Sequence, residues 1–254
     1  MKKALLWKLK ASLPIVLSLI IHIVPVTAQR EAKPPKAVVV TDPKDKQSIN
    51  GYVYIATVWG QQLKLPRQYP RALIHLKDAM NRWTEVYTNL DNPLKLDSKR
   101  LLEMPFVFIT TDGSFILTPI ERENVREYFE KGGFMVFDNA RPSNTASPAG
   151  KSFKQMIRDV LGEQAVFRTI SDNHHLFHCF FDFPEGAPEG IFLQKQIPGH
   201  LDGIMYNNRL AAVYSNMGYV GKWNDDTGNT LQLKMGVNMV IYALTQQEHP
   251  SQQK

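Results

Sequence analysis

Apolar residues recur in two patterns that alternate along the chain: short continuous runs, and segments in which they lie three or four positions apart. The first pattern is typical of buried strands and the second of amphipathic helices. We expect strands of one sheet, three of them central, at the strongest runs, which are 52–56, 106–110, 134–137 and 210–214. Weaker extended segments are expected at 84–88, 165–167 and 177–183.

Helical spacing fills the stretches between these runs. The expected helices cover 71–81, 119–129, 152–161 and 236–244. Pro119 suits the first turn of its helix, and Gly132-Gly133 marks where that helix ends. Strands alternating with helices predict an α/β fold with a mainly parallel central sheet and helices on both faces, arranged as a three-layer sandwich.

Residues 1–28 have the pattern of a secretory signal peptide. A basic start precedes an apolar run from Leu13 to Val26, and a small residue, Ala28, stands at the expected cleavage point. The run is shorter than the roughly 20 residues of a membrane-spanning helix, which favours cleavage over the alternative of an N-terminal anchor. We therefore expect an exported protein, periplasmic or extracellular, that begins at Gln29 and keeps no stable membrane span.

The rest of the chain divides by composition. Charged and proline-rich residues predict a linker or N-terminal arm at 29–48, a single domain follows at 49–247, and a polar tail ends the chain at 248–254. Hydrophobic residues make up 43% and charged residues 21%, which excludes a wholly disordered chain. Loss of residues 1–28 removes four lysines and no acid, which lowers the net charge from +6 to +2. No nucleic-acid partner is expected from so weak a charge.

Several segments follow one another in the order and spacing of a known bacterial family. They are Met104–Thr110, Tyr128–Phe134, Val136–Asp138, His174–His178, Leu201–Ile204 and Gly236–Asn238. Through them the chain resembles the family catalogued as domain of unknown function 4159, which is related in fold to the class I glutamine-amidotransferase-like superfamily. The resemblance spans nearly all of 49–247 and implies a flavodoxin-like fold without an established activity. The amidotransferases carry a nucleophilic cysteine on the turn after a central strand, and the corresponding turn here, residues 111–115, has none.

Polar residues gather where two of the expected central strands end. Asp112 and Ser114 come shortly after one of these strands. The next strand along the chain is followed directly by Asp138, Asn139 and Arg141. Because open parallel sheets bind ligands at the carboxyl ends of their strands, neighbouring strands would bring these side chains into one crevice.

In such a crevice Asp138 would act as a base, Ser114 as a hydrogen-bond donor and Arg141 as an anion clamp. The alternative is turn chemistry, since these residue types favour loops for local hydrogen bonding. In either case we expect the backbone to leave the sheet at Asp138. In the structural alternative its carboxylate would accept from the amides of residues 139–143.

Histidines are densest at His174, His175 and His178. The extended segment expected immediately after them does not suit a helical pair of metal ligands, and no His-Glu-x-x-His motif is present. We therefore expect packed or capping histidines and neither a metal nor another cofactor, with His174 in the crevice as an alternative. The single cysteine, Cys179, lies among aromatic residues and is expected to be buried and inert. Trp223 lies in a polar stretch, from which it would be able to cap a pocket.

Two functions fit these patterns. The first is an exported, non-catalytic α/β binding or assembly module of the bacterial cell envelope, with a small polar ligand or a cell-envelope protein as its partner. The alternative is a periplasmic hydrolase of a small polar or carbohydrate substrate, which requires Asp112, Asp138 and His174 in one cleft.

Overall fold

A computed structural model describes residues 36–40, 42, 45–143, 147–191 and 200–246. The expected signal peptide (1–28) and polar tail (248–254) lie outside the described residues. In the described ranges, no helix is both long and apolar enough to cross a bilayer.

Nine strands form one mixed, mainly parallel sheet in the described part of the chain. The main path runs β1 (Lys36–Val40), β2 (Ile49–Trp59), β5 (Phe106–Thr111), β6 (Phe134–Asn139), β9 (Arg209–Ser215), β8 (Leu201–Tyr206) and β7 (Val166–Thr169). Two further strands, β3 (Glu85–Leu90) and β4 (Leu94–Lys95), pair with β2 in parallel. Strands β2, β5, β6 and β9 run parallel to one another, whereas β1, β8 and β7 join antiparallel.

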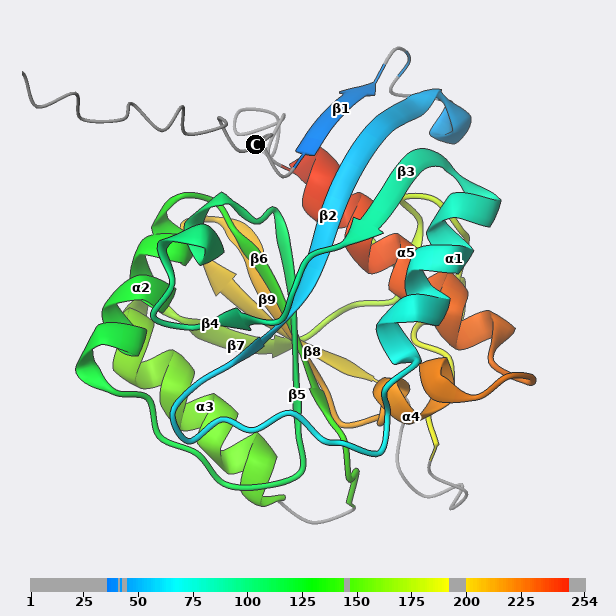
Figure 1. The fold of residues 1–254 in the computed structure, drawn as a ribbon. Coiled ribbons are helices and arrows are strands. Elements are labelled where there is room, and N and C mark those ends of the chain that lie inside the picture. Colours follow the sequence, from blue (N-terminus) through cyan, green and yellow to red (C-terminus); the bar gives the residue numbers. More distant parts are fainter. Residues whose placement is uncertain (1–35, 41, 43–44, 144–146, 192–199, 247–254) are drawn as a thin grey trace, which may run out of the picture. The chain divides into compact units, whose positions relative to one another are not determined.

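Helices cover both faces of this sheet (Figure 1). One face carries α2 (Pro119–Glu130) and α3 (Pro148–Leu161), and the other carries α1 (Ala72–Trp83), α4 (Tyr219–Asn224) and α5 (Thr230–Thr245). A separate cluster of buried apolar side chains fills each interlayer space. The predicted α/β fold, a flavodoxin-like three-layer sandwich with a mainly parallel sheet, is confirmed.

The side chains of the central strands explain why these strands lie in the middle of the sheet. Every residue of β5 and β6 is buried, as expected for strands covered on both faces. Alternate residues point to opposite helix layers: Phe106 and Phe108 pack toward α5, whereas Val107 and Ile109 pack toward α2. This alternation determines which polar residues can meet at the strand ends.

Three sequence expectations need correction. Strand β6 continues through Asp138 to Asn139, so the backbone does not leave the sheet at Asp138. The segment 177–183 is not a strand: a short 3-10 helix (His175–Phe177) is followed by turns and bends. Trp223 is fully buried in α4, with its ring 4.9 Å from that of Phe108, because the indole completes the core under a short helix.

Candidate functional site

A pocket of about 320 Å³ opens at the carboxyl ends of β2 and β5. The sheet supplies its floor, while α1, the loop before α1 and the start of α4 supply its walls. Its lining includes Leu65, Tyr69, Leu73, Phe108, Thr110 and Val220. The walls are mainly apolar, and Tyr69 donates a hydrogen bond to the carbonyl of Ala140 at 3.3 Å, which fastens the loop to the end of β6.

A row of polar side chains crosses the sheet at the inner end of this pocket. Thr110, Asp138 and Ser215 are register partners on β5, β6 and β9. All three are buried, and by strand alternation they point toward the layer of α1, α4 and α5. Of the row, Thr110 lines the pocket directly.

Asp138 holds the start of α4. Its Oδ2 atom accepts a hydrogen bond from the amide of Val220 at 2.8 Å. Burial raises the pKa of this carboxyl to about 6, although hydrogen bonds from Ser215 and from the amides at 218–220 act in the opposite direction. The expectation that Asp138 serves the amides of 139–143 is therefore wrong: its partners lie some eighty residues further along the chain.

Two oxygens in this row have no hydrogen-bond partner among the described residues. They are Thr110 Oγ1 and Asp138 Oδ1, and both are inaccessible to solvent. Buried oxygens of this kind are rare in folded proteins because leaving them unpaired costs about 1–3 kcal/mol each. Of these two residues only Thr110 lines the pocket, and Asp138 lies behind it.

Asn139 points to the opposite face of the sheet. Its Nδ2 donates to Ser147 Oγ at 3.0 Å and to Asn216 Oδ1 at 2.7 Å, and its Oδ1 accepts from the amide of Arg141 at 3.2 Å. Asn139 therefore joins three loops at the strand ends, and strand alternation separates it from the row of Asp138.

Asp112 and Arg141 meet at the surface. Arg141 Nη2 lies 3.6 Å from Asp112 Oδ2, and the Arg141 side chain is 79% exposed. Ser114 is also exposed. The structure thus brings Asp112 and Arg141 together, but on a solvent-facing loop.

His174 lies at the other end of the sheet. Its ring is 5.7 Å from that of Tyr242, and Tyr242 in turn packs 5.3 Å from Phe134, the first residue of β6. His174 Nδ1 accepts from the amide of Leu176 and caps the short 3-10 helix, while burial lowers the pKa of the imidazole. The structure therefore does not bring Asp112, Asp138 and His174 into one cleft.

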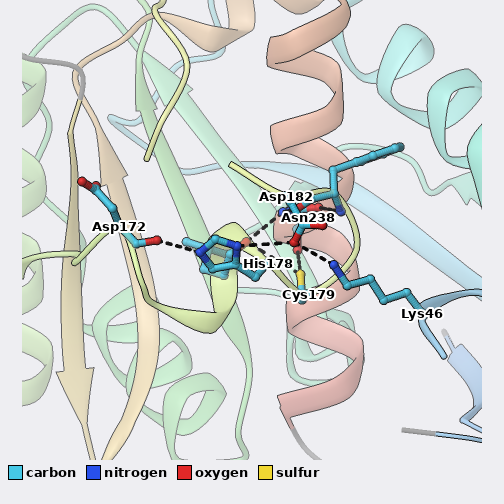
Figure 2. A network of polar contacts seen from close by, with 8 residues as sticks. Lys46, Asp172, His178, Cys179, Asp182 and Asn238 are labelled. Carbon is cyan, nitrogen blue, oxygen red and sulfur yellow. Dashed lines mark hydrogen bonds and ion pairs between the residues drawn. The ribbon is translucent and has the colours of Figure 1, made fainter. Parts of the chain in front are cut away.

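Residues 174–183, the histidine-rich segment, are held against α5 by a network of polar contacts, which Figure 2 shows. Asn238 on α5 accepts from the amide of Phe181 at 2.8 Å and donates to the carbonyls of Leu176 and Phe181. Cys179 Sγ donates to the carbonyl of Asn238 at 3.2 Å. The Asn238 side chain provides hydrogen bonds to backbone groups of this aromatic segment. The segment can therefore be buried as irregular coil and does not need to form the expected strand.

The other contacts of this network lie at the surface. The Nε2 atom of His178 lies 2.8 Å from the carbonyl oxygen of Asp172, and its Nδ1 atom lies 3.4 Å from Asp182 Oδ1. Lys46 forms an ion pair with the same Asp182 oxygen at 2.8 Å. These contacts fit the expectation of packed or capping histidines. Across the described ranges, no three His, Cys, Asp or Glu side chains gather as a metal site.

Sequence reasoning missed the residues that form the pocket. Thr110 was assigned only to a buried strand, and Tyr69 precedes the first expected helix. The sequence does contain a signal for Thr110. Side chains two positions apart on a strand point to the same face, so Thr110 must share a face with Phe106 and Phe108. The contribution of α4 could not be found in this way, because that helix was not expected.

The fold is that of an α/β protein of flavodoxin-like architecture, with a pocket at the carboxyl edge of its sheet. A family model described as "Domain of unknown function (DUF4159)" matches residues 54–244, so the chain belongs to this family. No curated protein matches the chain in sequence. The relationship in fold to the glutamine-amidotransferase-like superfamily stays a prediction.

Proposed function

We propose that this protein is an exported, non-catalytic binding module whose ligand occupies the pocket between α1 and the end of β5. The observation that carries this proposal is a pocket of about 320 Å³ with mainly apolar walls and a few polar residues, Thr57, Asp91 and Thr110, in its lining. Binding sites of small molecules typically pair apolar walls with a few placed polar groups. The position also agrees with the general location of ligand sites in open α/β sheets.

The positions of the other candidate site residues agree with a binding role. Asp138 is engaged in holding α4, the ion pair of Asp112 with Arg141 faces solvent, and His174 packs on Tyr242. Recognition by the pocket needs none of these groups to transfer a proton. The module would act in the cell envelope, with a small polar ligand or an envelope protein as its partner.

The pocket can be tested with a fragment library followed by ligand-observed NMR. Leu73→Trp would fill the pocket, whereas Ile120→Trp adds the same ring at an exposed position of α2 as a matched control. We expect fragments that bind the wild type and Ile120→Trp but not Leu73→Trp. A library without binders, or binders indifferent to Leu73→Trp, would refute the proposed site.

The proposal of export rests on the N-terminal segment. N-terminal sequencing of the protein purified from its native cells should give Gln29 as the first residue, in a soluble extracytoplasmic fraction. A chain that still begins at Met1 and sediments with the membranes would contradict export.

The alternative of a periplasmic hydrolase lacks the arrangement that it requires, because Asp112, Asp138 and His174 do not share one cleft. The two functions differ in the fate of a bound ester or glycoside. Release of product that stops in Asp138→Asn would support the hydrolase, and recovery of the intact ligand would support the binding module.

A further inference from the structure

We infer that a second pocket, at the start of α2, binds a neutral sugar ring, with Trp59 as its apolar wall and Lys95 and Asp97 as hydrogen-bonding groups. The pocket has a volume of about 310 Å³ and lies between the end of β2 and the first turn of α2. This inference goes beyond the proposed function, because it concerns a different pocket from the one between α1 and the end of β5.

The second pocket lies where the connections of the sheet diverge. From β2 the chain crosses to β3 through α1, and from β5 it crosses to β6 through α2. Strands β2 and β5 are paired, but α1 and α2 lie on opposite faces of the sheet (Figure 1). Open α/β sheets bind their ligands outside the carboxyl ends of the strands at such a point. The second pocket occupies the α2 side of it.

Glu121 gives this pocket a fixed floor. The residue is buried, and its two carboxylate oxygens accept hydrogen bonds from the amide of Gln61 at 2.7 Å and from the amide of Thr118 at 2.8 Å. Gly60 permits the close approach, since a Cβ there would lie 2.6 Å from Glu121 Oε1. The end of β2 is therefore tied to the first turn of α2 before any ligand binds, and a preformed site loses less entropy on binding.

Polar groups that the protein does not use surround this floor. The Asp97 carboxylate and the side-chain amide of Gln61 have no hydrogen-bond partner among the described residues. The Lys95 ammonium lies 5.1 Å from the centre of the Trp59 ring and makes no ion pair within the described ranges. An ammonium only donates, a carboxylate only accepts, and an amide does both. Hydroxyl groups, which donate and accept, can pair with all three kinds.

The charges of the lining favour a neutral ligand. The lining contains two basic residues, Lys64 and Lys95, and two acidic residues, Asp97 and Glu121. An anion would meet the repulsion of both acids, and a cation that of both lysines. A molecule with several hydroxyl groups and no charge meets neither repulsion, so the lining selects a polyhydroxyl compound.

Trp59 indicates that this compound is a ring. The indole ends β2 and is half-buried, so that its position is fixed while part of it lines the pocket. A sugar ring carries hydroxyls at its rim and C–H groups on its faces, and the faces can pack on an aromatic side chain. An apolar cavity of about 150 Å³ already holds benzene, so the pocket has room for one six-membered ring with its hydroxyls. A small zwitterion would leave the indole uncovered.

Ligand-observed NMR on the purified protein at pH 7.5 tests the class. The probes are glucose, galactose and mannose, the amino and uronic acid derivatives of each, glycine and inorganic phosphate. We expect at least one neutral hexose to bind, and its two charged derivatives to bind at least about five-fold more weakly, the effect of one like-charge contact in water. Absence of binding by all three hexoses would overturn the inference, as would equal or tighter binding of a charged derivative, glycine or phosphate.

Two tryptophan variants locate the apolar contact. Trp59→Leu should weaken hexose binding at least about five-fold, because it removes the aromatic wall. Trp83→Leu is the matched control: Trp83 is also half-buried, but it packs on Phe181, 5.6 Å away between ring centres, and does not line the pocket. Unchanged affinity in Trp59→Leu, or an equal loss in Trp83→Leu, would refute the assigned wall.

Charge variants at exposed positions test the lining without disturbing the core. Asp97→Asn leaves an excess of lysines and should raise the affinity for the uronic acid relative to its parent hexose. Lys95→Gln leaves an excess of acids and should do the same for the amino sugar. Asp159→Asn, which removes an exposed carboxylate of α3, should change neither ratio. If Asp97→Asn and Lys95→Gln also leave both ratios unchanged, the lining does not contact the sugar and the inference fails.

The Leu73→Trp variant separates this pocket from the one in the proposed function. We expect hexose binding to be the same in Leu73→Trp as in the wild type. If Leu73→Trp abolishes it, the sugar lies in the pocket between α1 and β5, so that this inference fails while the proposed function stands. If Leu73→Trp changes the binding of no fragment but a hexose binds and responds to Trp59→Leu, the proposed function fails and this inference stands.

Discussion

The carboxylate of Asp138 accepts a hydrogen bond from the amide of Val220 at 2.8 Å and thereby fixes the start of α4 from within the sheet. The helix has only six residues, and its N-cap is Gly218, in the left-handed region at φ 66° with no side chain to serve as a cap. Asp138 on β6 supplies the missing acceptor from a distant part of the chain. The same helix carries Val220 into the pocket wall, so the contact that caps α4 also supports the pocket.

Asp138 should make stability depend on pH in a specific direction. Burial raises its pKa from 3.8 to about 6, so the folded protein holds this proton more tightly than the unfolded chain. The resulting stabilisation is fully present below about pH 4 and is lost as pH rises through 6. Between pH 4.5 and 7.5 the wild type should therefore lose roughly 2 kcal/mol relative to Asp138→Asn.

Urea denaturation of both proteins at the two pH values measures this difference. Asp112→Asn, which removes an exposed carboxylate from the neighbouring loop, serves as the matched control and should follow the wild type. A constant difference between wild type and Asp138→Asn across this range would show that Asp138 is not held in a desolvated site.

Removal of the Asn238 amide should loosen the histidine-rich segment locally. Asn238→Ala deletes one accepted and two donated hydrogen bonds to buried backbone, which should cost about 2–4 kcal/mol. Hydrogen exchange should show faster exchange at the amides of 176–183 than in the wild type. Asp182→Asn weakens only exposed contacts of the same segment, with Lys46 and His178, and should cost less than about 1 kcal/mol.

Two glycines should differ sharply in tolerance to alanine. A Cβ at Gly133 would collide with the ring of Tyr128, whose hydroxyl is itself fixed on the carbonyl of Phe134 at 2.7 Å. Gly133→Ala should therefore lower the free energy of unfolding by about 1–3 kcal/mol, as overpacking of a core does. At Gly113 a Cβ meets open space, so Gly113→Ala should leave the melting temperature within a degree or two, about the effect of a surface change.

Cys179 should be chemically silent in the folded protein. Burial raises the pKa of its thiol to about 12, so almost no thiolate exists at pH 8. A disulfide reagent such as DTNB should label it only after denaturation. Ser114→Cys, which places a thiol at an exposed position, should react at once and provides the positive control. Rapid labelling of native wild-type protein would contradict the burial of Cys179.

The central sheet was predictable because its strands are encoded locally. Phe106 to Ile109 and Phe134 to Phe137 are apolar at every position, and few structures other than doubly covered strands accommodate such runs. The antiparallel strand β8 was not predicted: Asp202 and Gly203 interrupt its apolar pattern, and its pairing depends on a hairpin with positive φ at Asn207 and Asn208.

The site was less predictable because its partners are distant in the chain. Helix α4 has no local cap, and only tertiary contact with Asp138 reveals where it starts. The aromatic run from Phe177 to Phe183 carries strand-like composition, yet Asn238, nearly sixty residues later, determines its irregular path. Local composition correctly predicted polar residues at the strand ends. Asp138 and Asn139 are adjacent in β6, however, so their side chains point to opposite faces of the sheet and do not share one crevice.

Strand β1 covers one edge of strand β2. It pairs in antiparallel fashion with residues 49–53 of β2, so that the first half of β2 is flanked by β1 on one side and β3 on the other. An uncovered strand edge offers a row of free amides and carbonyls to any other extended chain. Since β1 is itself the last strand on its side of the sheet path, proteolysis that severs residues 36–40 would transfer the open edge to residues 49–53 of β2, where an extended segment of a neighbouring molecule would be able to pair.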